Sequence, residues 1–326
     1  MEEALSSFVV MAHRLPAPAV ATPESEVSAY RPLSFAIAYR MVGSVAETED
    51  IVQEAFLRLH RARQDGVEVE SPRAYLAALT TRLAIDHLRS ARVRRESYVG
   101  PWLPEPVVQE KEPAMERQIE MGESVSMAFM LVLEALSPVE RAVFLLHEVF
   151  EYPYEEIAQI VEKSEGNCRQ IFARAKRHID AGKPRFEVSP AKREQIAGQF
   201  FAACERGELD GLVRVLAADA AFYGDGGGKA AAFTRPVTGA DRVARLVAGV
   251  FAKFKPSGIR VVPVEVNGQP GAKLVDRQER VVGVWSVETA AGRVQCVRSV
   301  VNPDKLRHLG PVSDLLTRPI RRREDS

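Results

Sequence analysis

The sequence predicts a multidomain protein in which two all-α helical domains precede a C-terminal α+β domain. Three observations support this fold class. Apolar residues recur at helical spacing in two segments of the N-terminal half, a proline-rich stretch separates these segments, and short β-rich runs dominate after about residue 259. A chain of 326 residues is also long enough for two or three compact domains.

Changes in composition set the expected domain boundaries. From the N-terminus we expect a disordered leader, a first helical domain, an acidic linker, a second helical domain, an α+β domain and a basic tail, at residues 1–27, 28–96, 97–123, 124–183, 189–312 and 313–326. Prolines deny the linker a regular helix, so it is expected to be extended. Trp102 in this linker is expected to dock, because an exposed indole leaves a large apolar surface in water.

The first helical domain is expected to contain two long helices. Ser44 and Glu47 form a capping-box pattern before the first one, and apolar residues then recur at helical spacing. The opposite, polar face of this helix carries Asp50, Gln53 and Glu54.

The second helix of this domain is expected to begin at Ser71, an N-cap residue that is followed by proline. Its expected buried residues are Leu76, Leu79 and Leu83. Its C-terminal half is rich in arginine and includes Arg82, Arg89 and Arg92. A stripe of arginines on one helix face could lie along DNA phosphates. The alternative is a solvated helix end, where the helix dipole favours cations.

The second helical domain is expected to contain a helix-turn-helix in the run YEEIAQIVEKSEGNCRQIFARAKRHI. Cys168 and Ile171 are expected to face inward on its second helix. The residues expected to face outward toward DNA are Arg169, Gln170, Arg174, Lys176 and Arg177. Arginine can bind guanine and glutamine can bind adenine bidentately, whereas trailing cations suit phosphates. The alternative is a plain helical hairpin with a charged exterior.

Glu162 stands at the turn position that many such motifs fill with glycine. A residue other than glycine at positive φ costs roughly 1 kcal/mol, and we expect the domain to tolerate this cost.

The C-terminal segment is expected to contain helices followed by a mostly antiparallel sheet. The expected helices span residues 191–205, 209–216 and 240–254, and the expected strands span residues 220–223, 259–266, 273–276, 281–288 and 294–301. The expected breaks between strands are at Gly268, Gly271 and Gly292.

The run YGDGGGK, residues 223–229, looks like a phosphate-binding loop but fails the tests for one. A Walker loop requires a glycine five residues before Gly228 and a hydroxyl after the lysine, yet Tyr223 and Ala230 occupy these positions. A dinucleotide-binding fingerprint is also absent. The sequence therefore predicts a loop whose glycines allow another backbone to approach closely.

The charge balance and the cysteine content of the chain limit its possible functions. Lys+Arg and Asp+Glu are equal at 44 each, so the protein lacks the excess of basic residues expected if it held nucleic acid unaided. Three cysteines without C-x-x-C spacing argue against a zinc site or disulfides and indicate a reducing, cytoplasmic location. We expect no metal, no cofactor and no membrane partner. The carboxylates Asp219, Asp225 and Asp241 could do acid–base chemistry, but turn or capping roles are more common.

These segments resemble an extracytoplasmic-function (ECF) sigma factor of bacterial RNA polymerase. The runs AETEDIVQEAFLRLH and SPRAYLAALTTRLAIDHLRSARVRRE are similar to sigma region 2, and the run from LSPVERAVFLLHEVF through the helix-turn-helix is similar to region 4. The remainder is similar to a SnoaL-like extension of NTF2-like fold. The runs WLPEP, DGGGK and NPDKL are similar to short signatures of the sigma factors that carry this extension.

The resemblance implies partners and residue roles. The partners would be promoter DNA and the polymerase core, through the β′ clamp helices and the β subunit. Asp50, Gln53 and Glu54 would contact the clamp helices. Loop 65–70 and the arginine-rich helix would open and hold the −10 element, and the second helix of the helix-turn-helix would bind the −35 element in the major groove. Most members place tryptophan where this chain has Tyr75, so that helix is expected to pack differently.

The resemblance also implies regulation within the same polypeptide, with no separate anti-sigma protein. We expect the linker to lie against the α+β domain and to fix the spacing of the two DNA-binding domains. The residues expected to make this contact are Trp102, Leu103, Pro104, Asp225, Gly226, Gly227, Gly228, Lys229, Asn302, Pro303, Asp304 and Lys305.

Two other functions remain open at this point. One is a one-component regulator whose helix-turn-helix binds DNA alone while a cavity in the NTF2-like domain senses a small ligand. The other is a SnoaL-type isomerase or cyclase fused to a DNA-binding module. Binding to polymerase core would distinguish a sigma factor from both.

Overall fold

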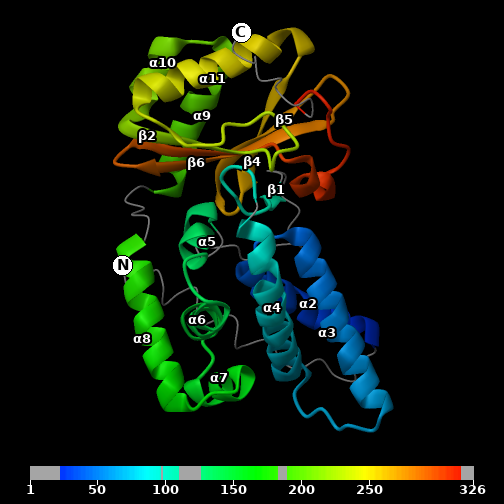
Figure 1. Cartoon of the computed structure of the whole chain (residues 1–326). Coiled ribbons are helices and arrows are strands. Elements are labelled where there is room, and N and C mark those ends of the chain that lie inside the picture. Colours follow the sequence, from blue (N-terminus) through cyan, green and yellow to red (C-terminus); the bar gives the residue numbers. More distant parts are fainter. Residues whose placement is uncertain (1–22, 97, 110–125, 183–188, 317–326) are drawn as a thin grey trace. The chain divides into compact units, whose positions relative to one another are not determined.

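The computed structural model describes residues 23–96, 98–109, 126–182 and 189–316 of the chain (Figure 1). It divides into two compact units. The helical unit comprises residues 1–93 and 130–183, and the sheet unit comprises residues 94–129 and 184–326. Most of the predicted leader, part of the linker and most of the basic tail lie outside the described residues.

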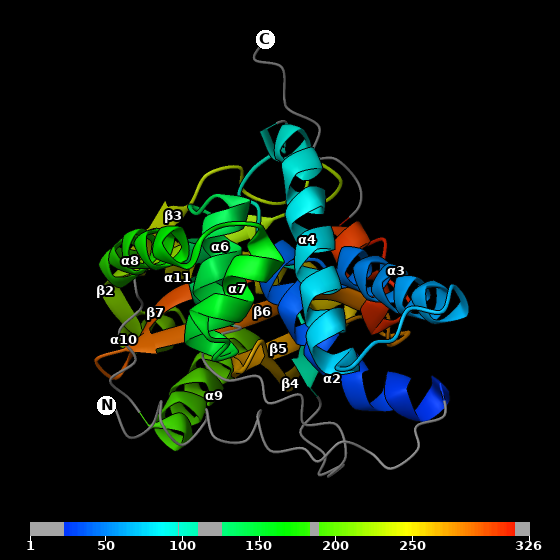
Figure 2. The ribbon, with the colours of Figure 1, turned by 90° about the horizontal axis from the view of Figure 1, so that it is seen from below.

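The helical unit contains both predicted helical domains. The helices of the first domain are α2 (Pro23–Val42), α3 (Val45–Gln64) and α4 (Pro72–Glu96). The second contains α5 (Met127–Leu133), α6 (Pro138–Phe144), the π-helix η2 (Leu145–Val149), α7 (Tyr154–Val161) and α8 (Glu165–Gly182). Figure 2 shows α6, α7 and α8 side by side.

The predicted helix starts are confirmed by side-chain caps. The Ser44 hydroxyl accepts from the Glu47 backbone N–H, and Ser137 and Glu140 form a complete capping box before α6. Glu162 ends α7 in the left-handed conformation, with φ of 56°. Cys168 and Ile171 are buried, which confirms the inward face of α8.

The packing of α4 differs in part from the prediction. Leu76 is buried, but Leu79 and Leu83 are only half-buried against the cluster of Ala55 and Leu59. Tyr75 packs at the margin of the same cluster and is also half-buried. The fully buried apolar face of α4 is formed instead by Leu76, Ala77, Ala84, Ile85 and Leu88.

The sheet unit is a layer of helices over a seven-stranded sheet. Its helices are α9 (Pro190–Arg206), α10 (Leu209–Val215), α11 (Ala240–Phe254) and the short 3-10 helices η3 (Lys255–Ser257), η4 (Pro303–Lys305) and η5 (Arg307–Leu309). Its strands are β1 (Val108–Gln109), β2 (Leu216–Asp225), β3 (Val237–Thr238), β4 (Arg260–Val266), β5 (Gln269–Val275), β6 (Val281–Ala290) and β7 (Arg293–Val300).

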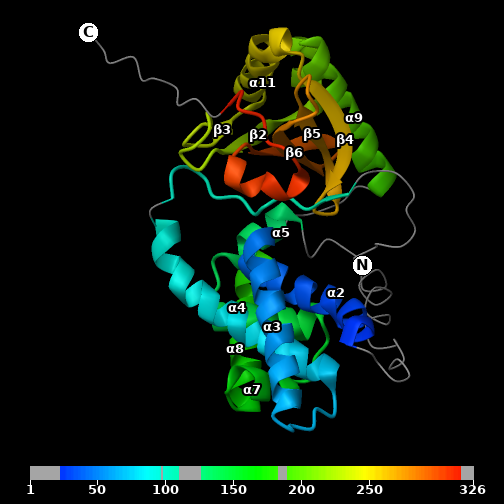
Figure 3. The same cartoon turned by 90° about the vertical axis from the view of Figure 1, so that its right-hand side faces the viewer.

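The strand order is β1-β4-β5-β6-β7-β2-β3. All neighbouring pairs are antiparallel except β2 and β7, which are parallel. Figure 3 shows α9 and α11 on one face of the sheet. The core between these layers includes Phe200, Phe222 and Trp285, with Phe222 and Trp285 in edge-to-face contact at 5.4 Å. The predicted fold class, two helical domains and an α+β domain, is confirmed.

Several elements differ in position from the sequence-based expectations. Helix α2 begins at Pro23, inside the predicted leader, and Ser313 is buried, beyond the predicted end of the α+β domain. Its hydroxyl donates to Asp276, which draws the start of the predicted tail into the domain. Gly271 is not at a break but within β5. A Cβ there would lie 2.4 Å from the Trp285 carbonyl oxygen, so this glycine permits close approach of strands.

Candidate nucleic-acid, polymerase and linker sites

The outward face of α8 carries the residues predicted to bind the −35 element. Arg169, Gln170, Arg174 and Arg177 are exposed, and Lys176 is half-buried. The helix is anchored from its other face, where Ala175 and Ile179 join Cys168 and Ile171 in the core. The geometry therefore presents a basic helix face with a buried back, as major-groove binding requires.

Acidic neighbours already orient most of these cations. Arg169 pairs with Glu165 at 2.8 Å, Arg174 with Glu140 at 2.9 Å, and Lys176 with Glu148 at 3.1 Å. Ser137, with its own hydroxyl and backbone N–H, is the main cause of a lowered Glu140 pKa, and Arg174 adds to it. Exposed ion pairs of this kind contribute about 0–1 kcal/mol, so DNA phosphates can compete for the same cations.

The arginines of α4 divide into two kinds. Arg89 is exposed and pairs with Asp86 on its own helix at 3.1 Å. Arg82 instead donates from Nε to the Ile160 carbonyl at 2.9 Å and from Nη2 to the Gln159 carbonyl at 2.8 Å. The side chain of Arg92 lies outside the described residues. Arg82 and Arg89, the two of these arginines whose side chains are described, therefore contact different partners.

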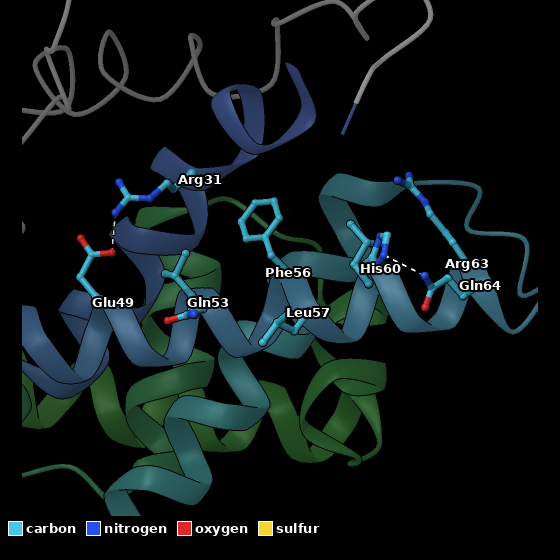
Figure 4. A pocket seen from close by; sticks show the side chains of 10 residues that line it. Arg31, Glu49, Gln53, Phe56, Leu57, His60, Arg63 and Gln64 are labelled. Carbon is cyan, nitrogen blue, oxygen red and sulfur yellow. Dashed lines mark hydrogen bonds and ion pairs between the residues drawn. The ribbon is translucent and has the colours of Figure 1, made fainter. Parts of the chain in front are cut away.

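The predicted polymerase-contacting residues lie along α3. Asp50 and Gln53 are exposed, and Glu54 pairs with Arg58 at 2.7 Å. Gln53 also lines a groove of about 750 Å³ that includes Arg31 of α2 (Figure 4). The other lining residues are Glu49, Val52, Phe56, Leu57, Leu59, His60, Arg63 and Gln64. An apolar floor with a charged rim is typical of a protein-binding surface.

The linker site centres on the buried carboxylate of Asp225, at the end of β2. It has no exposed surface. The carboxylate accepts hydrogen bonds from the Leu103 backbone N–H at 2.8 Å, the Lys305 ammonium at 2.8 Å and the Tyr98 hydroxyl. A buried ion is stable only when such donors replace its lost water.

Lys305 holds the linker from a second direction. Its ammonium also donates to the Leu103 carbonyl and lies 4.4 Å from the centre of the Trp102 ring and 4.8 Å from that of Tyr98. One buried lysine therefore bonds the backbone of the linker and contacts two of its aromatic faces.

The glycines of DGGGK are explained by close approach. At Gly227, φ is 56°, and a Cβ would lie 2.2 Å from Asn302 Nδ2 and 2.9 Å from the Tyr98 hydroxyl. At Gly228, a Cβ would lie 3.2 Å from the Val99 side chain. Lys229 pairs with Asp304, which joins the loop to the NPDKL run. This loop cradles a polypeptide rather than a phosphate.

The linker is also anchored further along. The Pro106 carbonyl lies 2.8 Å from His308 Nε2. Val107 exchanges two hydrogen bonds with Asn267, one through the side chain and one through the backbone. Residues Val108 and Gln109 then form β1 and pair antiparallel with β4. The linker therefore extends the sheet as an added strand.

Three residues of this site were missed by sequence analysis: Tyr98, Asn267 and His308. Burial first, and then the neighbouring Asp225, raise the pKa of Tyr98 well above its usual value. The nearest signal was local, because Tyr98 lies four residues before Trp102 in the same linker. The partners of all three are far away in sequence, so spacing alone gave no pairing.

The catalytic alternative finds no support in this geometry. Asp219 and Asp241 are exposed. The Asp225 carboxylate is buried and accepts hydrogen bonds from Leu103 and Lys305 in the linker site. Within the described ranges, no three metal-binding side chains are grouped together. Nor does the described part of the chain contain a helix long and apolar enough to cross a membrane.

We expect replacement of Gly227 with alanine to loosen the linker. The new methyl group would collide with Asn302 and Tyr98, and overpacking of this kind costs about 1–3 kcal/mol. Trp102 fluorescence measures the change, because release exposes this indole to water. Gly292→Ala is the control, since its positive φ is similar but, apart from its chain neighbours, no atom of the described residues would lie within 4 Å of its Cβ. An equal response to both substitutions would contradict the steric explanation.

The fold and these surfaces define a two-domain DNA-binding protein of the transcription-initiation class. Residues 27–94 match the Sigma-70 region 2 family and residues 126–179 match the Sigma-70 region 4 family. The chain is 36% identical to the ECF RNA polymerase sigma factor SigJ of Mycobacterium tuberculosis, over 86% of this chain and 92% of SigJ. It is 34% identical to the probable ECF RNA polymerase sigma factor SigI of the same species, over 85% of this chain and 92% of SigI.

The crystal structure of M. tuberculosis SigJ is similar to the whole fold, with a TM-score of 0.69, 33% identity, and coverage of 87% of this chain and 98% of that one. The chain belongs to the ECF RNA polymerase sigma factors. It therefore acts with the RNA polymerase core in promoter recognition and transcription initiation, and it is not an enzyme. The two alternative functions are set aside by this assignment.

Proposed function

We propose that α3, α4 and α8 divide the work of this sigma factor. Asp50, Gln53 and Glu54 on α3 contact the β′ clamp helices, and the groove beside Gln53 enlarges that surface. The arginines of α4 hold the −10 element. The outward face of α8 binds the −35 element, supported by its exposed Arg169, Gln170 and Arg174. The balanced charge of the chain fits a protein that binds promoters only in the cytoplasmic complex with polymerase.

We further propose that the sheet unit regulates this activity in cis, without a separate anti-sigma protein. The observation that carries this proposal is the buried Asp225–Lys305 pair, whose coordination is completed by groups of the linker. An ion pair that is buried within one domain can receive all its hydrogen bonds from that domain. Here the linker supplies a backbone N–H, a backbone carbonyl and a tyrosine hydroxyl, so docking and burial of the pair depend on each other.

Docking of the linker controls how far the two DNA-binding domains can separate. Residues 98–109 belong to the tether between these domains. A residue of extended chain spans at most about 3.3–3.6 Å, so these twelve residues, once released, can contribute up to about 40 Å to the reach of the tether. Because the contact is intramolecular, it acts at roughly millimolar effective concentration, and a modest affinity suffices.

Run-off transcription with purified core polymerase tests the proposal. We expect the full chain to support promoter-dependent transcription, and we expect Trp102→Ala to change the amount of transcript without changing the helical circular dichroism. Arg307→Ala serves as a control, since this exposed residue lies in the same region and its guanidinium pairs with Asp304. Transcription by the Trp102 variant at the level of the parent protein would refute regulation through the linker. Failure of the full chain to bind core would refute the polymerase contacts.

A further inference from the structure

Helix α7 receives its C-terminal cap from another domain. The last carbonyls of a helix need donors, and cations are stabilising there. The last turn of α7 contains no basic residue. Arg82 of α4 fills this role, because its guanidinium donates to the carbonyls of both Gln159 and Ile160.

Further contacts join the two helical domains. Arg141 of α6 is buried and donates to the Met41 carbonyl at the end of α2. The Arg40 guanidinium lies 5.4 Å from the centre of the Phe150 ring. Burial raises the pKa of the Tyr152 hydroxyl, and the guanidinium of Arg73, in the first turn of α4, acts in the opposite direction, so these two side chains interact across the domains. The two domains therefore pack as a single closed unit, with α4 beside α7 (Figures 1 and 2).

This closed unit conflicts with binding to a promoter. The −10 and −35 elements are centred about 25 base pairs apart, and each pair advances the helix axis by about 3.4 Å, so their separation is roughly 85 Å. In the closed unit, a guanidinium on the −10 helix reaches the helix-turn-helix directly. Arg82 has five N–H donors, so the exclusion comes from distance. While Arg82 bonds the α7 carbonyls, it keeps the helix-turn-helix beside α4, and the two domains cannot reach both promoter elements.

We propose that Arg82 is a positioning residue with two exclusive partners: the C-terminus of α7 in a closed form, and promoter DNA in an open form that binds polymerase. This inference rests on the proposed DNA-binding role of α4. In the closed form, the Arg82 guanidinium donates to the carbonyls at the C-terminus of α7 and does not contact DNA. Opening on polymerase releases it at the moment when the −10 element becomes available.

The affinity for core polymerase, measured without DNA, reports this equilibrium even when the open form is rare. The apparent dissociation constant is the intrinsic constant divided by the open fraction. Arg82→Ala removes charged hydrogen bonds that hold the closed form, so it should tighten core binding about tenfold or more. Tyr152→Phe removes the hydroxyl that interacts with the Arg73 guanidinium and should also tighten core binding, by less than Arg82→Ala, although Tyr152 has no proposed DNA contact.

Arg89→Ala is the matched control on the same helix. Among the described residues Arg89 pairs with Asp86 of its own helix, and it has the same proposed DNA role, so its loss should leave core affinity unchanged. With promoter DNA added, both arginine variants should form open complexes more weakly than the parent, whereas Tyr152→Phe should not. The thermal melting of each variant confirms that the helical unit is folded.

The outcomes separate this inference from the function on which it rests. If the parent protein fails to bind core, the proposed function is wrong. If the parent binds core but Arg82→Ala and Tyr152→Phe bind it with parental affinity, the closed form is not held by these residues and the inference is overturned. If only Arg82→Ala leaves core affinity unchanged, Arg82 does not act as the cap that withholds α4 from DNA.

Discussion

Replacement of Lys305 with methionine is expected to release the linker from the sheet unit. The Asp225 carboxylate would remain fully buried with two donors in place of three, and loss of one partner from a buried ion pair costs about 3–5 kcal/mol. If this free energy is lost from linker docking, the equilibrium constant for docking falls by a factor of about 100 or more. Hydrogen exchange at the Leu103 amide measures it, because this N–H is bonded to Asp225 only while the linker is docked.

Lys229→Met is the matched control. Lys229 also bridges two signatures of the site, but its pair with Asp304 is exposed and is expected to contribute about 0–1 kcal/mol. A double variant with Asp225→Asn and Lys305→Met removes both charges and should recover part of the Leu103 protection. Equal deprotection by the two lysine variants, or full protection of Leu103 in Lys305→Met, would contradict the central role of the buried pair.

Loss of both Arg169 and Gln170 is expected to remove most of the dependence on the −35 sequence. Each bidentate contact to a base contributes about 1–3 kcal/mol of discrimination, which corresponds to about 5–150-fold. The measurement is run-off transcription from the parent promoter and from one with a scrambled −35 element. The double alanine variant should transcribe the two promoters at similar, low levels, since the proposed contacts to bases are gone.

Arg177→Ala distinguishes base contacts from phosphate contacts on the same helix. Arg177 is exposed near the end of α8, and loss of a phosphate contact should weaken both promoters alike and reduce the salt slope by about one. Preserved discrimination between the two promoters in the Arg169 and Gln170 variant would place −35 recognition elsewhere on α8.

The features that the sequence predicted well are local ones. Ser137 and Glu140 stand three residues apart and cap α6 as expected. Glu162 was expected at positive φ from its place in the helix-turn-helix, and the structure confirms it. These features depend on neighbours in the chain, so a pattern of residue types is enough to predict them.

The features that the sequence did not predict depend on distant partners. Tyr98 reaches a carboxylate 127 residues away, and Arg82 reaches a carbonyl 78 residues away. Spacing indicated an arginine suited to phosphates, but it contains no information about the carbonyls at the end of α7. Likewise, Gly271 was expected at a turn because glycine is common in turns, whereas close packing of β5 on Trp285 requires it.

The short strand β1 has a consequence for solubility. Among the described residues, it pairs with β4 at Glu265 and Val266, and further along β4 the residue Pro263 has no backbone N–H to offer. An uncovered strand edge is a template for association with another chain. When β1 leaves, the backbone hydrogen-bonding groups of these two β4 residues become exposed at the edge of the sheet. A sigma factor whose linker stays released is therefore expected to self-associate more readily, and redocking of β1 covers this edge again.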